Sequence, residues 1–249
     1  MAVAVCAGAA ETLQFRPSAD TSLVETAADN SLGGWEFFNV GTTGTGTRNR
    51  GLLFFDLEQA IPQGSTVLSA TLQIEVVFIP QTAQVQSSIM GLHRMLTDWG
   101  EGTQAPANFL APGFGAPAIS GEATWNTPFF GGPETWGAPG GLGGVDYNVT
   151  PSATTVVEDA DLYMFDALPR VVGDVQSWVT HPDANYGWML KTLFEEDRYT
   201  ARRIGDREDP FAAALLTVTF EPIPEPRLAW LLVPAALACM IFRPALRRA

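Results

Sequence analysis

Three tryptophans and four arginines of the sequence have side chains suited to non-covalent ligand binding. Aromatic rings pack against the apolar face of a sugar, and a guanidinium group forms paired hydrogen bonds with a uronate carboxylate. A structural role is the alternative for two of them, because Trp125 could lie in the core and Arg207 could pair with Glu208. The pattern predicts non-covalent ligand binding by Arg94, Trp99, Trp125, Trp136, Arg202, Arg203 and Arg207.

Catalysis by histidine or cysteine is not indicated. The two histidines, His93 and His181, offer neither a His-His metal spacing nor a Ser-His-Asp set. The two cysteines, Cys6 and Cys239, each lie in an apolar stretch near one end of the chain. If both ends are processed or embedded, the remaining region has no thiol, which excludes disulfides, cysteine-ligated zinc and cysteine nucleophiles there.

Carboxylates occur in two runs, Glu195-Glu196-Asp197 and Asp206 with Glu208 and Asp209. A glycosidase needs two carboxylates about 5 to 10 Å apart across a cleft, whereas such runs in an acidic chain are typical of a solvated face. We therefore predict a protein that is not an enzyme, with no catalytic residue, no metal site and no cofactor. Calcium is the alternative for these carboxylates, although no EF-hand spacing supports it.

The overall charge argues against a nucleic-acid partner. Acidic residues outnumber basic ones 27 to 14, which gives a formal net charge of −13 at pH 7. Such a body repels polyanions at long range, so an anionic ligand would need a local group of arginines to overcome the field.

The elements that must position these residues are short strands. The 24 glycines and 18 prolines indicate many turns, and alternation of apolar and polar residues is clearest from Thr66 to Ile79. With no βαβ alternation, this order predicts an all-β, jelly-roll-like β-sandwich. The expected strands are Thr12–Val24, Glu36–Val40, Asn49–Leu57, Thr66–Ile79, Ser88–Leu96, Val145–Val149, Trp188–Phe194, Thr200–Ile204 and Phe211–Phe220.

Two segments interrupt the strands. The segment from Thr97 to Gly144 holds half of the chain's glycines, so we expect a long surface excursion here. Its aromatic residues indicate that at least part of this excursion is packed. Leu168 to Val179 changes to a helical period, with Val171, Val175 and Trp178 on one face, and predicts one short amphipathic helix.

Both ends of the chain predict export. Residues 1–10 read as the remnant of a signal peptide, with Ala7-Gly8-Ala9 suited to signal peptidase and a disordered tail as the alternative. Residues 221–227 form a proline-rich linker, and residues 228–249 a hydrophobic transmembrane helix with a basic tail. The uncharged stretch from Leu228 to Phe242 is short for a bilayer, which suits a transient anchor better than a permanent span.

The order of Pro224-Glu225-Pro226, an apolar stretch and terminal arginines resembles the PEP-CTERM sorting signal of Gram-negative bacteria. The resemblance implies an exosortase-type membrane protease as a partner, and export to the cell surface, outer envelope or extracellular matrix.

Residues 11–220 resemble a DNRLRE domain. The excursion after Trp99 is longer than that pattern, and Asp159 to Phe165 fits it poorly. The resemblance implies a β-sandwich module of a secreted or surface protein, in some members similar to modules that bind acidic polysaccharides such as alginate. Its motifs are Ala19-Asp20-Thr21, Leu52 to Leu57, Ile61-Pro62, Leu68 to Leu72, Trp99 to Gly102, Ala123 to Asn126, Gln176 to Trp178, Asn185 to Gly187 and Gly205 to Glu208.

Two functions remain open from the sequence. The first is a surface protein that binds acidic exopolysaccharide without catalysis, and the second is a structural matrix protein that contacts other proteins. A polysaccharide-degrading enzyme is a third and weaker alternative. Exposed tryptophans beside arginines would favour the first, and an acidic surface without such rings would favour the second.

Overall fold

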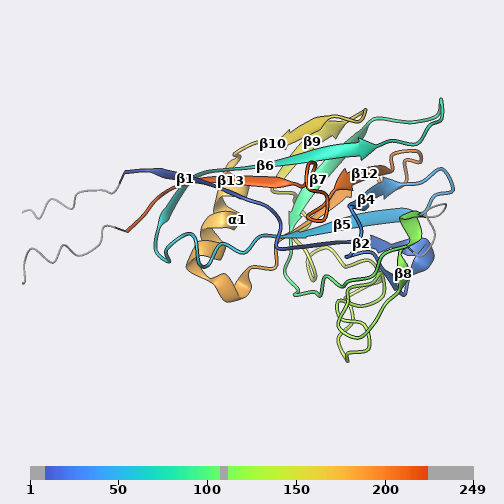
Figure 1. The fold of residues 1–249 in the computed structure, drawn as a ribbon, viewed down its shortest axis with the longest axis horizontal. Helices are drawn as coiled ribbons and strands as arrows, with labels where there is room; N and C mark the ends of the chain where they lie inside the picture. Colours follow the sequence, from blue (N-terminus) through green and yellow to red (C-terminus); the bar gives the residue numbers. More distant parts are fainter. Residues whose placement is uncertain (1–8, 107–111, 224–249) are drawn as a thin grey trace, which may run out of the picture.

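Thirteen β-strands and one α-helix make up the part of the chain that the structure, a computed structural model, describes: residues 9–106 and 112–223 (Figure 1). This confirms the all-β prediction. The strands are β1 (Glu11–Phe15), β2 (Ala19–Val24), β3 (Asn30–Ser31), β4 (Phe37–Thr42), β5 (Arg48–Phe54), β6 (Thr66–Phe78), β7 (Ser88–Arg94), β8 (Ala116–Pro117), β9 (Ala153–Val157), β10 (Leu162–Phe165), β11 (Trp188–Thr192), β12 (Arg202–Gly205) and β13 (Leu215–Glu221). The helices are α1 (Pro169–Thr180) and the short 3₁₀ turns η1 (Glu25–Ala27), η2 (Pro112–Phe114) and η3 (Pro182–Ala184).

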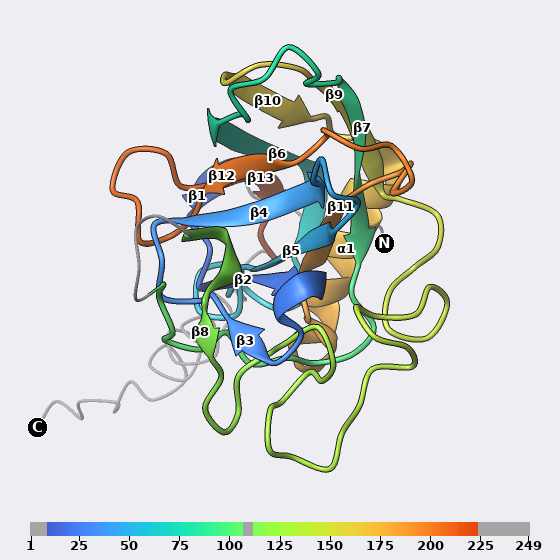
Figure 2. The ribbon, with the colours of Figure 1, turned by 90° about the vertical axis from the view of Figure 1, so that its right-hand side faces the viewer.

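Eleven of these strands form one antiparallel sheet that curls around an interior (Figure 2). The order is β1-β13-β6-β12-β4-β5-β11-β7-β9, with β10 beside β6 and β2 beside β5, while β3 and β8 pair separately. The first and last strands are neighbours, since Glu11 pairs with Phe220 and Phe15 with Leu216. Segments from the two ends of the described region thus share one edge of the sheet.

Strand β6 is the longest strand, and one irregularity in its pairing changes which of its side chains are buried. Leu72, Ile74 and Val76 are buried as their alternation predicts. Leu68, expected on the same face, is instead 46% exposed, and Val67 takes the buried position. The pairing with β13 shifts between Thr219 and Phe220, and such a bulge moves the side chains beyond it to the opposite face.

Helix α1 closes one end of the core and lies across the strand direction (Figure 1). Pro169 occupies its first turn, where a missing N–H costs no hydrogen bond. Val171, Val175 and Trp178 are buried, which confirms the predicted apolar face. The Trp178 ring packs edge-to-face on Trp188, with centroids 4.3 Å apart.

The expected strand from Val145 to Val149 is wrong, because this segment is a turn with only isolated bridges at Tyr147. The Asp146 carboxylate accepts hydrogen bonds from the backbone N–H groups of Gly137 and Leu142, which holds the chain in that turn. Val145 and Val149 are 53% and 67% exposed. Their β-propensity is therefore overridden by a local side-chain contact.

The sequence pattern also does not predict β9 and β10. Val156 in β9 and Leu162 and Met164 in β10 are exposed apolar residues, so neither strand alternates cleanly between apolar and polar side chains. Strand β10 lies within the stretch from Asp159 to Phe165 that departs from the DNRLRE pattern.

The predicted sorting signal Pro224, Glu225 and Pro226, the hydrophobic stretch after it and residues 1–8 lie outside the described residues. Among the helices that the structure does describe, none is both long enough and apolar enough to cross a membrane.

Candidate ligand-binding groove

A groove of about 570 Å³ lies where β4, β5 and β12 meet the turn between β4 and β5. The end of β6 and the 3₁₀ turn η2 contribute further walls through Phe78 and Phe114. Both rings are partly exposed, Phe78 by 39% and Phe114 by 48%. The groove therefore combines apolar surface with polar groups from the hairpin, a composition typical of sites for small ligands.

The hairpin β4–β5 supplies a row of hydroxyl groups to the groove. Its turn closes through a backbone hydrogen bond from the Thr43 N–H to the Thr47 carbonyl at 2.9 Å. Gly46 has a φ of +91°, a conformation that side chains rarely adopt. Thr43, Thr45 and Thr47 all line the groove, and the hydroxyls of Thr43 and Thr45 lie 2.9 Å apart.

Two buried asparagines stand at the base of this row. The Asn39 amide donates to the Gly113 carbonyl at 3.4 Å, and the Asn49 amide donates to the Gly41 carbonyl at 3.2 Å. These contacts fix the orientation of both side chains. No hydrogen bond between residues that the structure describes uses the Oδ1 atom of either asparagine, so both oxygens can accept from a ligand hydroxyl.

Arg203 of β12 is held in the groove by two aromatic rings. Its guanidinium carbon lies 4.6 Å from the Phe37 ring centroid and 4.7 Å from that of Phe78. Burial lowers the pKa of the Arg203 guanidinium below its usual value. Within the described ranges 9–106 and 112–223 no ion pair or hydrogen bond involves its side chain, so the N–H donors are available to an anionic ligand.

Arg202 also lines the groove but is committed to the fold. The side chain is only 1% exposed. Its Nη2 atom donates to the carbonyls of Gln86 and Glu158, both at 2.7 Å, and Nη1 donates to the Ala201 carbonyl at 3.0 Å. Arg202 thus ties three backbone segments together, which positions Arg203 beside it.

The other two candidate arginines make structural contacts away from the groove. Arg94 donates to the Ser177 hydroxyl at 3.0 Å and lies 3.9 Å from the Asp174 carboxylate. Arg207 Nε lies 2.6 Å from Glu101 and 3.0 Å from Glu208. The ion pair of Arg207 with Glu208, expected as the alternative, is confirmed.

The three candidate tryptophans are buried and do not form an exposed platform. Trp99, Trp125 and Trp136 are 8%, 3% and 4% exposed. They form a second hydrophobic cluster under the long excursion, with Leu52 and Met189 among its members, which confirms that the excursion is packed. The core alternative for Trp125 is confirmed, and Arg203 is the only one of the seven candidates left free in the groove.

Sequence reasoning missed most of the groove. The segment between the expected strands Glu36–Val40 and Asn49–Leu57 was assigned no role, and its alternating threonines are the signal that could have revealed a polar row. Asn39 and Phe78 carry no such signal, because they come from strands whose pairing brings them to the groove only in the folded chain.

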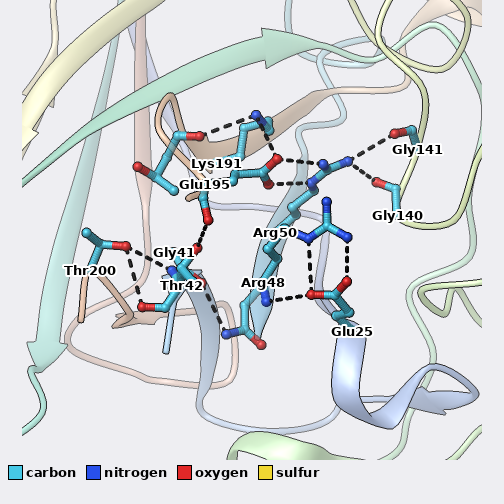
Figure 3. A network of polar contacts seen from close by, with 12 residues as sticks. Glu25, Gly41, Thr42, Arg48, Arg50, Gly140, Gly141, Lys191, Glu195 and Thr200 are labelled. Carbon is cyan, nitrogen blue, oxygen red and sulfur yellow. Dashed lines mark hydrogen bonds and ion pairs between the residues drawn. The ribbon is translucent and has the colours of Figure 1, made fainter. Parts of the chain in front are cut away.

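A network of buried charges stabilises β5 on its face opposite the groove (Figure 3). The guanidinium of Arg50 donates two hydrogen bonds to the Glu195 carboxylate, both at 2.7 Å, and two more to the carbonyls of Gly140 and Gly141. Lys191 Nζ lies 3.3 Å from the same carboxylate. Burial favours a higher pKa for Glu195, but the hydrogen bonds and charge of Arg50 outweigh it, so the pKa is lowered.

His93 beside this network provides a test of pH dependence. Its Nδ1 donates to the Asn148 carbonyl at 2.8 Å, and Nε2 has no partner among the described residues. Burial, reinforced by the charges of Lys191 and Arg50, lowers the pKa of His93 from 6.5 to about 4. Between these values the unfolded chain binds a proton and the folded chain does not, so stability should be lost as pH falls from about 6.5 to 4, by up to about 3 kcal/mol.

Urea unfolding at pH 7 and at pH 4.5 checks this expectation. His93→Gln should lose less stability between the two pH values than the wild type does. His181→Gln, at an exposed position, is the control and should behave as the wild type. An equal pH response in all three proteins would show that His93 does not carry the effect.

No protein-family model matches the chain and no curated protein gives a significant match, so its function has to be inferred from the groove's own chemistry.

Proposed function

We propose that the protein is an exported, surface-associated, jelly-roll-like β-sandwich that binds acidic polysaccharide in this groove without catalysis. The observation that carries the proposal is Arg203, whose guanidinium is held between two rings and has no acidic partner in the described part of the chain. In a protein with a net charge of −13, the Arg203 guanidinium supplies a local positive charge that can offset the repulsion of an anionic ligand.

Each part of the groove matches one part of a uronate chain. The planar guanidinium can form paired hydrogen bonds with a uronate carboxylate. The free Oδ1 atoms of Asn39 and Asn49 and the threonine hydroxyls suit sugar hydroxyls. The exposed faces of Phe78 and Phe114 offer apolar surface to the sugar ring, the role that the sequence had assigned to tryptophan.

Retention on alginate, a polymer of uronates, tests the proposal, with neutral dextran as the comparison. We expect the full chain to be retained on alginate at about 0.15 M salt, where long-range repulsion is screened. Arg203→Met should weaken the affinity at least about tenfold, because a charge-assisted hydrogen bond is worth roughly 1.5 to 3 kcal/mol. Phe114→Ala, at an exposed position, should weaken binding without a change in thermal stability.

Arg170→Met is the matched control, since Arg170 is exposed on α1 and does not line the groove. It removes the same charge and should leave retention unchanged. If neither alginate nor another acidic polysaccharide retains the wild type, or if both arginine variants bind equally, the groove is not a site for acidic polysaccharide.

The export part of the proposal is supported by sequence alone. The order of Pro224-Glu225-Pro226, an uncharged stretch and arginines suits processing by an exosortase-type membrane protease after transient membrane anchoring.

A structural protein that contacts other proteins is the second candidate. It is favoured by Phe211, which is 93% exposed, and by Phe194, which is 56% exposed. Phe211→Ser should then weaken self-association or partner capture while alginate retention is unchanged, a result that separates this function from groove binding.

A further inference from the structure

Three carboxylates from distant parts of the sequence converge outside the groove. Asp20 lies in β2, Asp206 follows β12, and Glu208 is two residues further along. One carboxylate oxygen from each lies within 4.8 Å of the others. The runs in the sequence place Asp206 and Glu208 near one another, but only the fold adds Asp20, and none of the three lines the groove.

Each of these carboxylates uses one oxygen for the fold. Asp20 Oδ2 accepts the backbone N–H of Arg207 at 2.9 Å, and Asp206 Oδ1 accepts the backbone N–H of Glu208 at 3.1 Å. Glu208 Oε1 lies 3.0 Å from Nε of Arg207. These contacts fix the side chains in place before any ligand arrives.

The second oxygen of each carboxylate is buried and lacks a partner. Asp20 Oδ1, Asp206 Oδ2 and Glu208 Oε2 have no hydrogen-bond donor among residues 9–106 and 112–223. Asp20 and Asp206 are both 0% exposed, whereas the Glu208 side chain is 28% exposed and gives the cluster an edge toward solvent. A buried carboxylate oxygen without a partner is costly, and a bound cation would remove that cost.

The nearby cation, Arg207, does not supply the missing partner of these carboxylate oxygens. Arg207 is divided between Glu101 and Glu208, and its guanidinium makes no ion pair with Asp20 or Asp206 in the described structure.

We propose that Asp20, Asp206 and Glu208 bind one divalent cation of the calcium type. All three ligands are hard oxygen donors, which calcium prefers. Calcium–oxygen distances of about 2.3 to 2.6 Å place ligand oxygens up to about 5 Å apart, and the three oxygens lie within 4.8 Å of one another. Magnesium demands shorter distances of about 2.0 to 2.1 Å in near-ideal octahedral geometry and is therefore expected to bind here less well.

A cation here would tie β2 to the segment after β12. These elements are separated by most of the described chain, so the ion would act as a cross-link in the folded state alone. Ligands that bind only the folded state raise the melting temperature with their concentration. Water from the Glu208 side can supply the remaining ligands, since calcium takes six to eight oxygens.

Thermal unfolding of the full chain after EDTA treatment, with and without calcium, tests the proposal. We expect calcium to raise the melting temperature by several degrees in a saturable manner, and magnesium to have a smaller effect at equal concentration. Calcium titration followed by calorimetry should give one site per chain. Asp206→Asn should abolish both the shift and the heat, because it removes a ligand charge while keeping the hydrogen bond to Glu208.

Two further variants keep the test decisive. Glu208→Gln, at the partly exposed edge, should fold and bind calcium at least about tenfold more weakly. Glu196→Gln, an exposed acidic position outside the cluster, should bind as the wild type does. Absence of a calcium shift and of binding heat in the wild type would overturn the proposal, as would an equal loss in Glu196→Gln and Glu208→Gln.

Discussion

Replacing Arg50 with methionine is expected to lower the free energy of unfolding by about 3 to 5 kcal/mol. Arg50 is 5% exposed, so its charge is matched almost entirely by protein groups. Methionine keeps most of the apolar stem of the side chain but removes every donor. The Glu195 carboxylate would keep only Lys191, and the carbonyls of Gly140 and Gly141 would lose their guanidinium donor.

Chemical denaturation measures this loss, and Arg48→Met is the matched control. Arg48 lies two residues away on β5 and pairs with Glu25, but the two side chains are 37% and 31% exposed. An ion pair this exposed contributes about 0 to 1 kcal/mol. Equal losses in the two variants would show that burial of the Arg50 network does not set its contribution.

The double variant Arg50→Met with Glu195→Met measures how much of the stability comes from the interaction between these two side chains. Removing both charges takes away the uncompensated carboxylate, so the double variant should be more stable than Arg50→Met alone. If the two losses simply add, the bidentate pair in Figure 3 contributes no coupling energy.

Trp178→Ala is expected to lower the free energy of unfolding by about 3 to 5 kcal/mol, the usual range for a large aromatic residue in a core. Trp178 is 1% exposed and packs against Trp188 at the end of the core that α1 closes. Alanine has a higher helix propensity than tryptophan, so the loss reports packing rather than helix formation. Urea unfolding followed by circular dichroism gives the value.

Gly173→Ala on the same helix is the control, and it should raise the free energy of unfolding instead of lowering it. Gly173 is exposed and an added Cβ meets no atom within 4 Å, so alanine should stabilise the protein by about 0.5 to 1 kcal/mol. A loss below about 1 kcal/mol for Trp178→Ala would mean that α1 is not essential to the core.

The sequence predicted much of the fold because hydrophobic period is a local property. Alternation along β6 and the helical spacing of Val171, Val175 and Trp178 both place buried side chains correctly. It failed where a specific contact overrode that period. The bulge against β13 turned Leu68 outward, and Asp146 turned a predicted strand into a turn.

The residue types of the candidate site were predictable from the sequence, but the position of the site in the fold was not. Residue type alone pointed to arginine and aromatic rings, and Arg203 does lie unpaired among rings in the groove. The tryptophans do not accompany it, because burying a large ring stabilises the fold more than exposing it, and the long excursion provides an interior for three of them. Phenylalanines from β4 and β6 surround Arg203 instead.

By itself the sequence determined an acidic, all-β chain without a cysteine between its two end segments, since composition and local period require no knowledge of contacts. Only the tertiary structure decided which charges are paired. It pairs Arg50 with Glu195, and it commits the donors of Arg202 to backbone carbonyls. It also leaves Arg203 open in the groove and brings Asp20 to Asp206 across most of the described chain. The physical reason is that a charged side chain is defined by its partners and its burial, and both arise from residues far apart in the sequence.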